Sequence, residues 1–201
     1  MSTERSSQAM ARAGSDRSPS VSDQRTANLI GALALAVSDR LYEAIGKIGA
    51  GGPSASAALT ALITYQEVWP SAIPVISIER LRRIVGLSHS ATVRLVDRLC
   101  DEGLLERHQS LDGREAVLGL TAEGKRAATR IISERQRLLD GVLLGLNSRE
   151  RRALGRALEK MLAGMTSGRW EARNICRLCD HRLCHPNPSC PVGDAATALG
   201  Q

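Results

Sequence analysis

Residues 77–124 constrain the fold of this 201-residue chain more than any other segment. Ser77 and Ser88 each precede a short amphipathic stretch, and a serine in that position can accept hydrogen bonds from the first free N–H groups of a helix. Gly86 interrupts the apolar pattern between the two stretches. Two short helices joined by a glycine-containing turn are typical of a helix-turn-helix, which we therefore predict here.

A β-hairpin is predicted directly after the second helix. Gly103 is suited to end that helix, because glycine readily adopts the left-handed conformation found after helix C-termini. Two short segments, 104–108 and 115–120, follow as candidate strands, and Asp112-Gly113 lies between them. An Asp-Gly pair between two such segments is a strong hairpin signal. A helix-turn-helix followed by a hairpin is the outline of a winged helix.

Longer helices are expected on both sides of this segment. Apolar residues recur at helical spacing over 23–47, and a second helix is predicted over 56–69. Two more are predicted over 121–146 and 148–165, the latter opened by an Asn147–Glu150 capping box. The chain has no Phe and only 2% aromatic residues, which favours helices over strands. We predict a mostly α fold: a winged helix-turn-helix with a small β-hairpin wing and long dimerisation helices.

The two ends of the chain differ in composition from the centre. Residues 1–22 are rich in Ser, Ala, Arg and Gln and are expected to form a disordered arm. Residues 23–168 should form the winged-helix and dimerisation domain, and residues 169–201 a cysteine-rich tail. The longest apolar run is too short to cross a bilayer, and the N-terminus has no apolar signal core. We expect a cytoplasmic protein with no membrane partner and with reduced thiols.

Four pieces of sequence resemble the MarR family of regulators. They are LSHSATVRLVDRL at 87–99, GLLER at 103–107, DGR at 112–114 and LTAEG at 120–124, in the right order and at the right spacing. The resemblance covers roughly residues 24–166. It implies a homodimer whose first and last helices interlock, with one winged helix in each subunit. It also implies binding to near-palindromic operators, usually as a repressor, and release of DNA when a ligand, metal or oxidant changes the dimer's shape.

Charge and local pattern agree with a double-stranded DNA partner. The formal net charge is +6 and the pI is about 9.5, values that suit a polyanion. A helix fits the major groove, where residues near its N-terminus reach base edges. The predicted DNA-contacting residues are Ser88, His89, Ser90, Thr92, Arg94 and Arg98, together with Arg114, which resembles the family's wing arginine and would enter the minor groove. An ion pair with Asp101 or Glu102 is the alternative for Arg98.

The tail contains a second candidate site, made of cysteines. Cys176, Cys179, Cys184 and Cys190 have the spacing C-x2-C-x4-C-x5-C. Four thiolates suit tetrahedral zinc, with an iron–sulfur cluster as the alternative and metal-free redox thiols as a third reading. His181 or His185 could replace one thiol, whereas Cys100 is expected to be a small buried side chain.

We therefore expect a sequence-specific transcription regulator that acts as a repressor and responds to metal or redox state through the tail, with an unknown effector. A thiol oxidoreductase is one alternative, but no βαβ pattern surrounds Cys176 and Cys179, so an enzyme is not expected. A non-specific, architectural nucleic-acid-binding protein is another. It would bind DNA with a strong dependence on salt and little on sequence.

Overall fold

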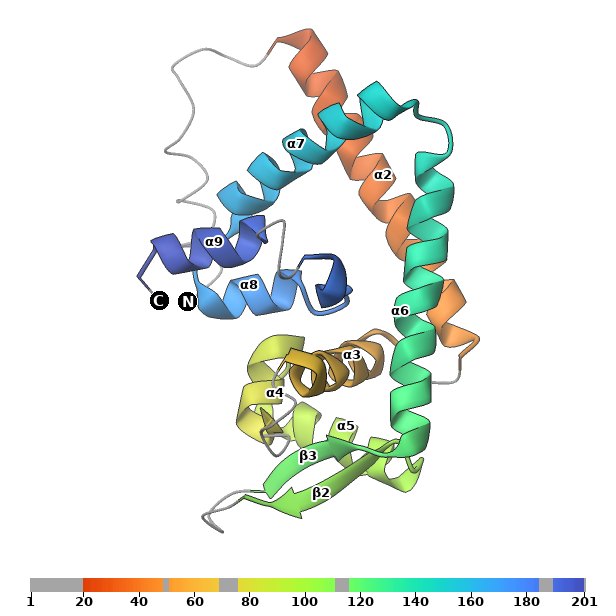
Figure 1. Cartoon of the computed structure of the whole chain (residues 1–201), viewed down its shortest axis with the longest axis vertical. Helices are drawn as coiled ribbons and strands as arrows, with labels where there is room; N and C mark the ends of the chain where they lie inside the picture. The colour runs from red at the N-terminus through yellow and green to blue at the C-terminus, as the bar shows by residue number, and fades with distance from the viewer. Residues whose placement is uncertain (1–19, 49–50, 69–75, 111–115, 185–189, 201) are drawn as a thin grey trace.

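The computed structural model describes residues 20–48, 51–68, 76–110, 116–184 and 190–200, and it is mostly helical (Figure 1). In chain order the elements are α2 (Val21–Gly46), α3 (Pro53–Val68), β1 (Ile76–Ser77), α4 (Ile78–Val85), α5 (His89–Asp101), β2 (Leu105–Gln109), β3 (Ala116–Leu120), α6 (Ala122–Leu143), α7 (Ser148–Met165), α8 (Arg169–Ile175), the 3₁₀ turn η1 (His181–Leu183) and α9 (Pro191–Ala198). The predicted fold class is confirmed.

Most of the predicted arm lies outside the described residues. Residues 21 and 22, the last two of the predicted arm, are part of α2 instead, because this helix begins at Val21. The reason is local: Ser20 and Asp23 form a capping box in which each side chain bonds the backbone N–H of the other.

The sheet has three antiparallel strands in the order β1-β3-β2. The predicted hairpin forms β2 and β3, with Leu105 opposite Leu120 and Gln109 opposite Ala116. The turn between these strands lies outside the described residues. Strand β1 was not predicted. Its residues Ile76 and Ser77 pair with Leu118 and Val117 of β3. This third strand fixes the wing against the start of the helix-turn-helix.

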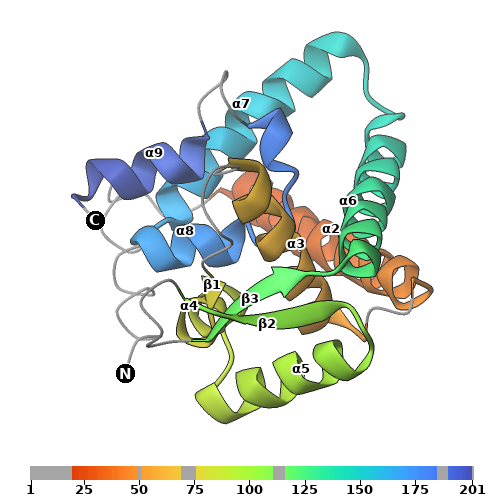
Figure 2. The same ribbon diagram turned by 60° about the horizontal axis from the view of Figure 1, so that its bottom comes forward.

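Helix α3 lies at the centre of the core. Its residues 55–63 are all buried, and it packs against α4, α6 and β3. Leu59 and Leu62 of α3 are fully buried, as are Ile45 at the end of α2 and Ile131 in α6. Figure 2 shows α5 on the outer side of this core, with β2 and β3 beside it.

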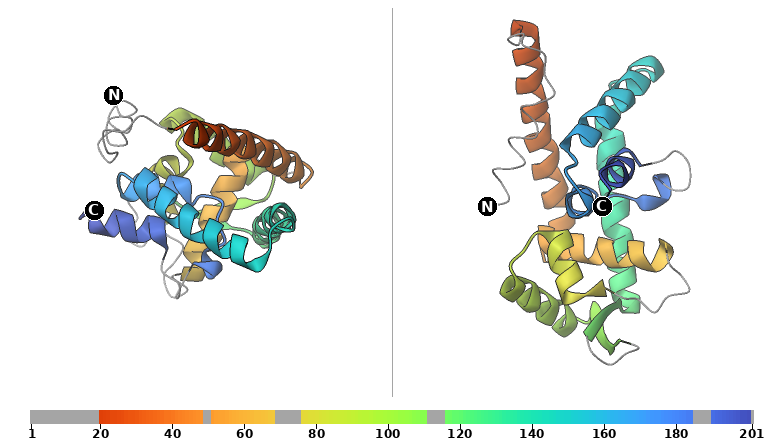
Figure 3. Two further views of the ribbon diagram at one scale, coloured as in Figure 1. Left: turned by 90° about the horizontal axis from the view of Figure 1, so that it is seen from above. Right: turned by 90° about the vertical axis from the view of Figure 1, so that its left-hand side faces the viewer.

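Helices α2 and α7 project away from the winged-helix part (Figure 3, right). The apolar face predicted for the first helix enters this chain's core only through Leu41 and Ile45. The N-terminal part of α2, which carries the rest of that face, lies outside this chain's core. Several large apolar side chains on the two helices are exposed: Leu29, Ile30, Leu33 and Leu35 on α2, and Leu158, Met161 and Met165 on α7.

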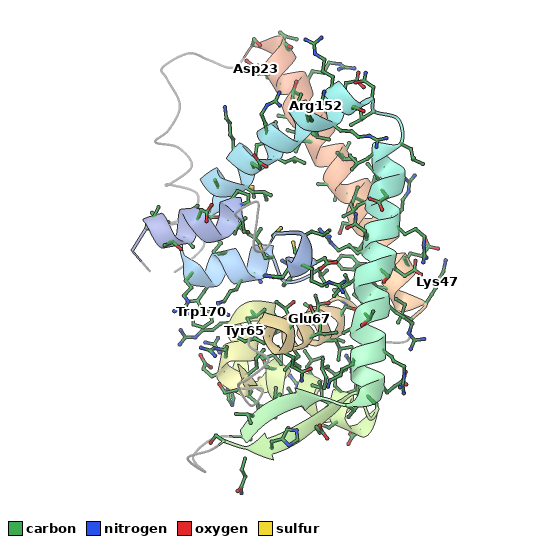
Figure 4. The ribbon with its side chains drawn as sticks, in the orientation of Figure 1. Asp23, Lys47, Tyr65, Glu67, Arg152 and Trp170 are labelled. Atoms are coloured by element: carbon green, nitrogen blue, oxygen red, sulfur yellow. The ribbon has the colours of Figure 1, made fainter. Side chains whose placement is uncertain are left out.

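The tail folds into α8, η1 and α9 and packs on the rest of the chain. Helix α8 contacts α4 and α9, and α9 contacts α7. Ala172, Val192 and Ala196 form a small apolar cluster of their own. Figure 4 shows Trp170 of α8 close to Tyr65 of α3. The tail thus encloses space between itself and the helix-turn-helix.

Candidate functional site

The helix-turn-helix is formed by local hydrogen bonds that the sequence predicted. The Ser77 hydroxyl accepts from Arg80 N at 3.3 Å, and the Ser88 hydroxyl accepts from Ala91 N at 3.3 Å. Gly86 ends α4 with a φ of 71°, in the left-handed region where a side chain would be strained. These caps set where α5 begins and therefore which side chains lie in its first turns.

One face of α5 is buried and the other is exposed. Leu95, Val96 and Leu99 pack inward, as predicted. His89, Ser90 and Arg94 are exposed near the N-terminal end, and Ser88 is exposed at the cap itself. A capped helix end with free N–H groups, a hydroxyl and a guanidinium can bond phosphates or base edges. Arg114, the predicted wing arginine, lies outside the described residues.

Two of the predicted DNA-contacting residues make contacts within the protein. Thr92 is fully buried, and its hydroxyl donates to the Ser88 carbonyl at 2.9 Å, so it is not available to DNA. Arg98 donates from Nη2 to the Gly51 carbonyl at 3.1 Å and lies 3.8 Å from a Glu102 carboxylate oxygen. Arg98 is thus held against the loop before α3, and the ion pair with Glu102 is confirmed.

An ion pair between the wing and α5 was not predicted. Arg107 of β2 donates to the Asp97 carboxylate of α5 at 2.5 Å. Asp97 lies three residues after Arg94, where its negative charge would oppose a phosphate. Arg107 balances that charge and ties strand β2 to helix α5. Only the strand's position relative to α5 reveals this pair, and sequence spacing does not give that position.

The base of the wing is closed by Thr121. Its hydroxyl donates to the Gly103 carbonyl at 2.7 Å and accepts from Gly124 N at 3.0 Å, so it caps α6 and holds the end of α5. A Cβ on Gly124 would overlap the Leu104 carbonyl oxygen and lie 3.0 Å from the Leu104 carbonyl carbon. The sequence LTAEG therefore specifies the junction where α5, the wing and α6 meet.

The four tail cysteines gather in one region around α8, η1 and the start of α9, and all are half-buried free thiols. Cys176 lies within hydrogen-bonding reach of both Cys179 and Cys190, and Cys184 within reach of Cys190. Within the part of the chain that the structure describes, no three or more Cys, His, Asp or Glu side chains are arranged to hold a metal ion.

The thiols differ in acidity. A hydrogen bond from Cys176 lowers the pKa of Cys179 to about 6, and the positive charges of Arg135 and Arg177 act in the same direction. The same hydrogen bond raises the pKa of Cys176, and burial raises the pKa of Cys184. Cys100 packs against the main core as predicted, and burial raises its pKa.

The tail is also attached to the helix-turn-helix, which the sequence did not indicate. Asn174 Nδ2 donates to the Ile84 carbonyl at 3.0 Å, close to the turn that joins α4 and α5. The Arg83 guanidinium lies over the Trp170 ring at 4.8 Å. Asn174, which bonds α4, lies two residues before the first tail thiol, Cys176.

Comparisons with known proteins agree with the fold. No family model matches the sequence. An uncharacterized HTH-type transcriptional regulator of Bacillus subtilis, YwhA, is 31% identical over 86 residues, which are 42% of this chain and 62% of that protein. The chain thus spans less than two thirds of this curated relative.

Solved structures of similar fold include MepR, a transcription regulator of the Staphylococcus aureus multidrug efflux pump MepA, with a TM-score of 0.59 and 14% identity over 70% of this chain and 98% of MepR. For Rv1404 from Mycobacterium tuberculosis the TM-score is 0.56 and the identity 23%, over 72% of this chain and 93% of Rv1404. For a MepR mutant bound to an oligodeoxyribonucleotide the TM-score is 0.52 and the identity 14%, over 70% of this chain and 98% of the mutant. These structures confirm the winged-helix fold that the sequence predicts. Among the described helices, none is long and apolar enough to cross a membrane.

Proposed function

We propose that this protein is a sequence-specific DNA-binding transcription regulator that acts as a homodimer, with repression as its mode of action. The observation that carries the proposal is the exposed N-terminal half of α5, where His89, Ser90 and Arg94 face outward beside the β2–β3 hairpin. The structural likeness to transcription regulators, one of them bound to an oligonucleotide, supports it.

In the proposed complex α5 lies in the major groove. Its first turn offers backbone N–H groups to a phosphate, and Arg94 reaches a base edge or the next phosphate. The hairpin follows the neighbouring backbone, where Arg114 enters the minor groove. Arg107 assists by balancing the charge of Asp97 on the outer side of α5.

The exposed apolar side chains of α2 and α7 support the homodimer. Leu29 and Leu33 lie on one face of α2, and Leu158, Met161 and Met165 follow helical spacing on α7. A second copy covering both faces would remove this surface from water and pair two α5 helices for one near-palindromic site. Leu33→Glu should convert a dimer into a monomer in light scattering; a monomeric wild-type protein would contradict the dimer.

DNA binding is tested with a site selected from random duplexes. Arg94→Ala and Arg114→Ala should each weaken binding to that site by about 1–3 kcal/mol while the dimer persists. The control is Arg130→Ala, an exposed residue of α6 that pairs with Glu123. Unchanged affinity in both test variants would refute the docking. Equal affinity for selected and random duplexes would point to the architectural alternative.

For the tail we propose a zinc ion held by Cys176, Cys179, Cys184 and Cys190, with an iron–sulfur cluster as the alternative. The donor set suits either group, and the low pKa of Cys179 supports a thiolate ligand. Binding would require the half-buried thiols to turn toward one ion, which would couple metal binding to folding of the tail. Such a group would make the regulator responsive to metal or redox state.

Metal analysis and visible absorption of anaerobically purified protein test this site. Zinc in a colourless protein supports the first assignment, and iron with sulfide and a brown colour supports the second. Cys190→Ser should lose the metal, whereas Cys100→Ser should keep it because Cys100 packs against the main core. Protein without either metal would refute both and leave redox thiols.

A further inference from the structure

A cavity of about 370 Å³ lies between the tail and the helix-turn-helix domain. Its inner wall comes from α3 and α4, through Ala61, Thr64, Tyr65 and Ile84. The rest of its wall comes from α8, η1, α9 and the residues at their ends. Its volume is in the range of small-molecule sites. The cavity exists only because the tail packs on the domain, so it is a property of this chain's own C-terminal segment.

The cavity wall is positively charged. Arg169, Arg173 and Arg177 line it, and the described residues of its wall include no Asp or Glu. Arg173 is half-buried, and burial lowers its pKa. The described residues give Arg173 no carboxylate in an ion pair, although many other arginines of the chain have one. A partly desolvated cation without a counter-ion is costly, so an anion at this position would be stabilised.

Arg173 is also held in a defined orientation. Its guanidinium lies over the Tyr65 ring at 5.1 Å and over the Trp170 ring at 5.6 Å (Figure 4 labels both aromatic residues). A guanidinium whose plane is fixed by stacking loses less side-chain entropy when it binds a carboxylate or phosphate. These contacts make Arg173 the best-placed of the three arginines to hold an anionic group.

The remaining surface is mainly apolar. Ala61, Ile84, Ala172, Val192 and Ala196 contribute aliphatic surface to the cavity. An inorganic ion would leave this surface uncovered, whereas a molecule with an apolar body and one anionic end would match both parts of the wall.

We propose that the cavity binds a small organic anion, an apolar molecule with one carboxylate or phosphate group. The anionic end pairs with Arg173, and the apolar body lies against Ile84 and Val192. Cys176 and Cys190 line the same cavity, so the ligand and the thiol site share a wall.

Ligand binding in the cavity would also regulate DNA binding, a coupling that rests on the proposed function. Asn174 lies next to Arg173 in α8 and bonds the Ile84 carbonyl at the end of α4. A ligand that moves α8 therefore moves a contact of the helix-turn-helix, and affinity for DNA changes with it.

Isothermal titration calorimetry on the full chain tests the site without DNA. The probes are benzoate, octanoate and phenyl phosphate, with benzamide and octanamide as uncharged counterparts of the two acids. At least one anion should bind with one molecule per chain and about ten-fold more tightly than its uncharged counterpart, a difference of about 1.4 kcal/mol. Arg173→Gln should remove that preference, whereas Arg130→Gln on the exposed side of α6 should keep it.

A second variant tests the cavity by volume instead of charge. Thr197 is exposed at its edge, so Thr197→Trp should block binding while leaving Arg173 and the fold intact. The site is refuted if no anion binds, if the amides bind as tightly as the acids, or if both variants bind like wild type. Anion binding without any change in DNA affinity would refute only the coupling between the cavity and DNA binding. Arg94→Ala should lose DNA binding but keep the anion affinity measured by calorimetry, because that titration contains no DNA.

Discussion

Replacing Gly124 by alanine tests the junction of α5, the wing and α6. Gly124 is buried in the first turn of α6, and a Cβ there would overlap the Leu104 carbonyl oxygen and crowd a Leu120 methyl group at 3.1 Å. The main obstacle is backbone, which cannot rotate away as a side chain can. The Leu104 carbonyl also accepts from Thr121 N at 3.2 Å, so moving it weakens that bond.

The expected loss follows from two opposing effects. Overpacking a buried site costs about 1–3 kcal/mol, and a backbone obstacle places this site at the upper end. Alanine gains back up to about 1 kcal/mol over glycine within a helix. The net destabilisation should be about 2 kcal/mol, which corresponds to a Tm lower by about 4–8 °C for a chain of this size.

Gly141→Ala is the matched control, because it lies in the same helix, is exposed and has nothing within 4 Å of an added Cβ. It should raise the Tm slightly through helix propensity alone. Both variants are measured by thermal unfolding followed by circular dichroism at one protein concentration. If Gly124→Ala unfolds at or above the wild-type temperature, the assigned packing at Leu104 is wrong.

Three further predictions concern single side chains. Thr121→Ala removes the α6 cap and should cost about 1–2 kcal/mol in denaturant unfolding; an unchanged midpoint would contradict the capping role. Glu79 has a pKa lowered to about 2 by hydrogen bonds from two arginines, so its contribution to stability is complete above its ordinary pKa of 4.5 and is lost as the pH falls toward 2. Glu79→Gln should therefore have a lower Tm than wild type at pH 7, and the gap should close in acid; a gap independent of pH would contradict this. Asn174→Ala should speed hydrogen exchange at the turn between α4 and α5, and equal exchange would show that the bond to Ile84 has no influence there.

Features that depend on near neighbours in the sequence were predictable. The caps at Ser77, Ser88, Thr121 and Asn147 use groups two or three residues away, so spacing alone indicates them. The buried face of α5 follows from its apolar period in the same way. The same period would have excluded one predicted DNA contact. Thr92 precedes Leu95 by three residues and Val96 by four, so all three side chains lie on the inner face of α5.

Features that depend on distant parts of the chain were not predictable. The partners of Arg107 and Asn174 lie 10 and 90 residues away, and neither distance leaves a periodic signal. The exposure of the N-terminal half of α2 depends on where α6 stops covering it. The packing of the tail was not predictable either: α8 and α9 pack on α4 and α7 and include a cluster of small apolar side chains that composition alone undervalues.

The packing of the tail gives α7 and the helix-turn-helix two independent connections. One runs through the backbone of α6, and the other runs from α7 through α9 and α8 to α4. A closed loop of contacts of this kind resists bending more than a single helix does. Any rotation of α7 must therefore either carry α4 and α5 with it or open the tail.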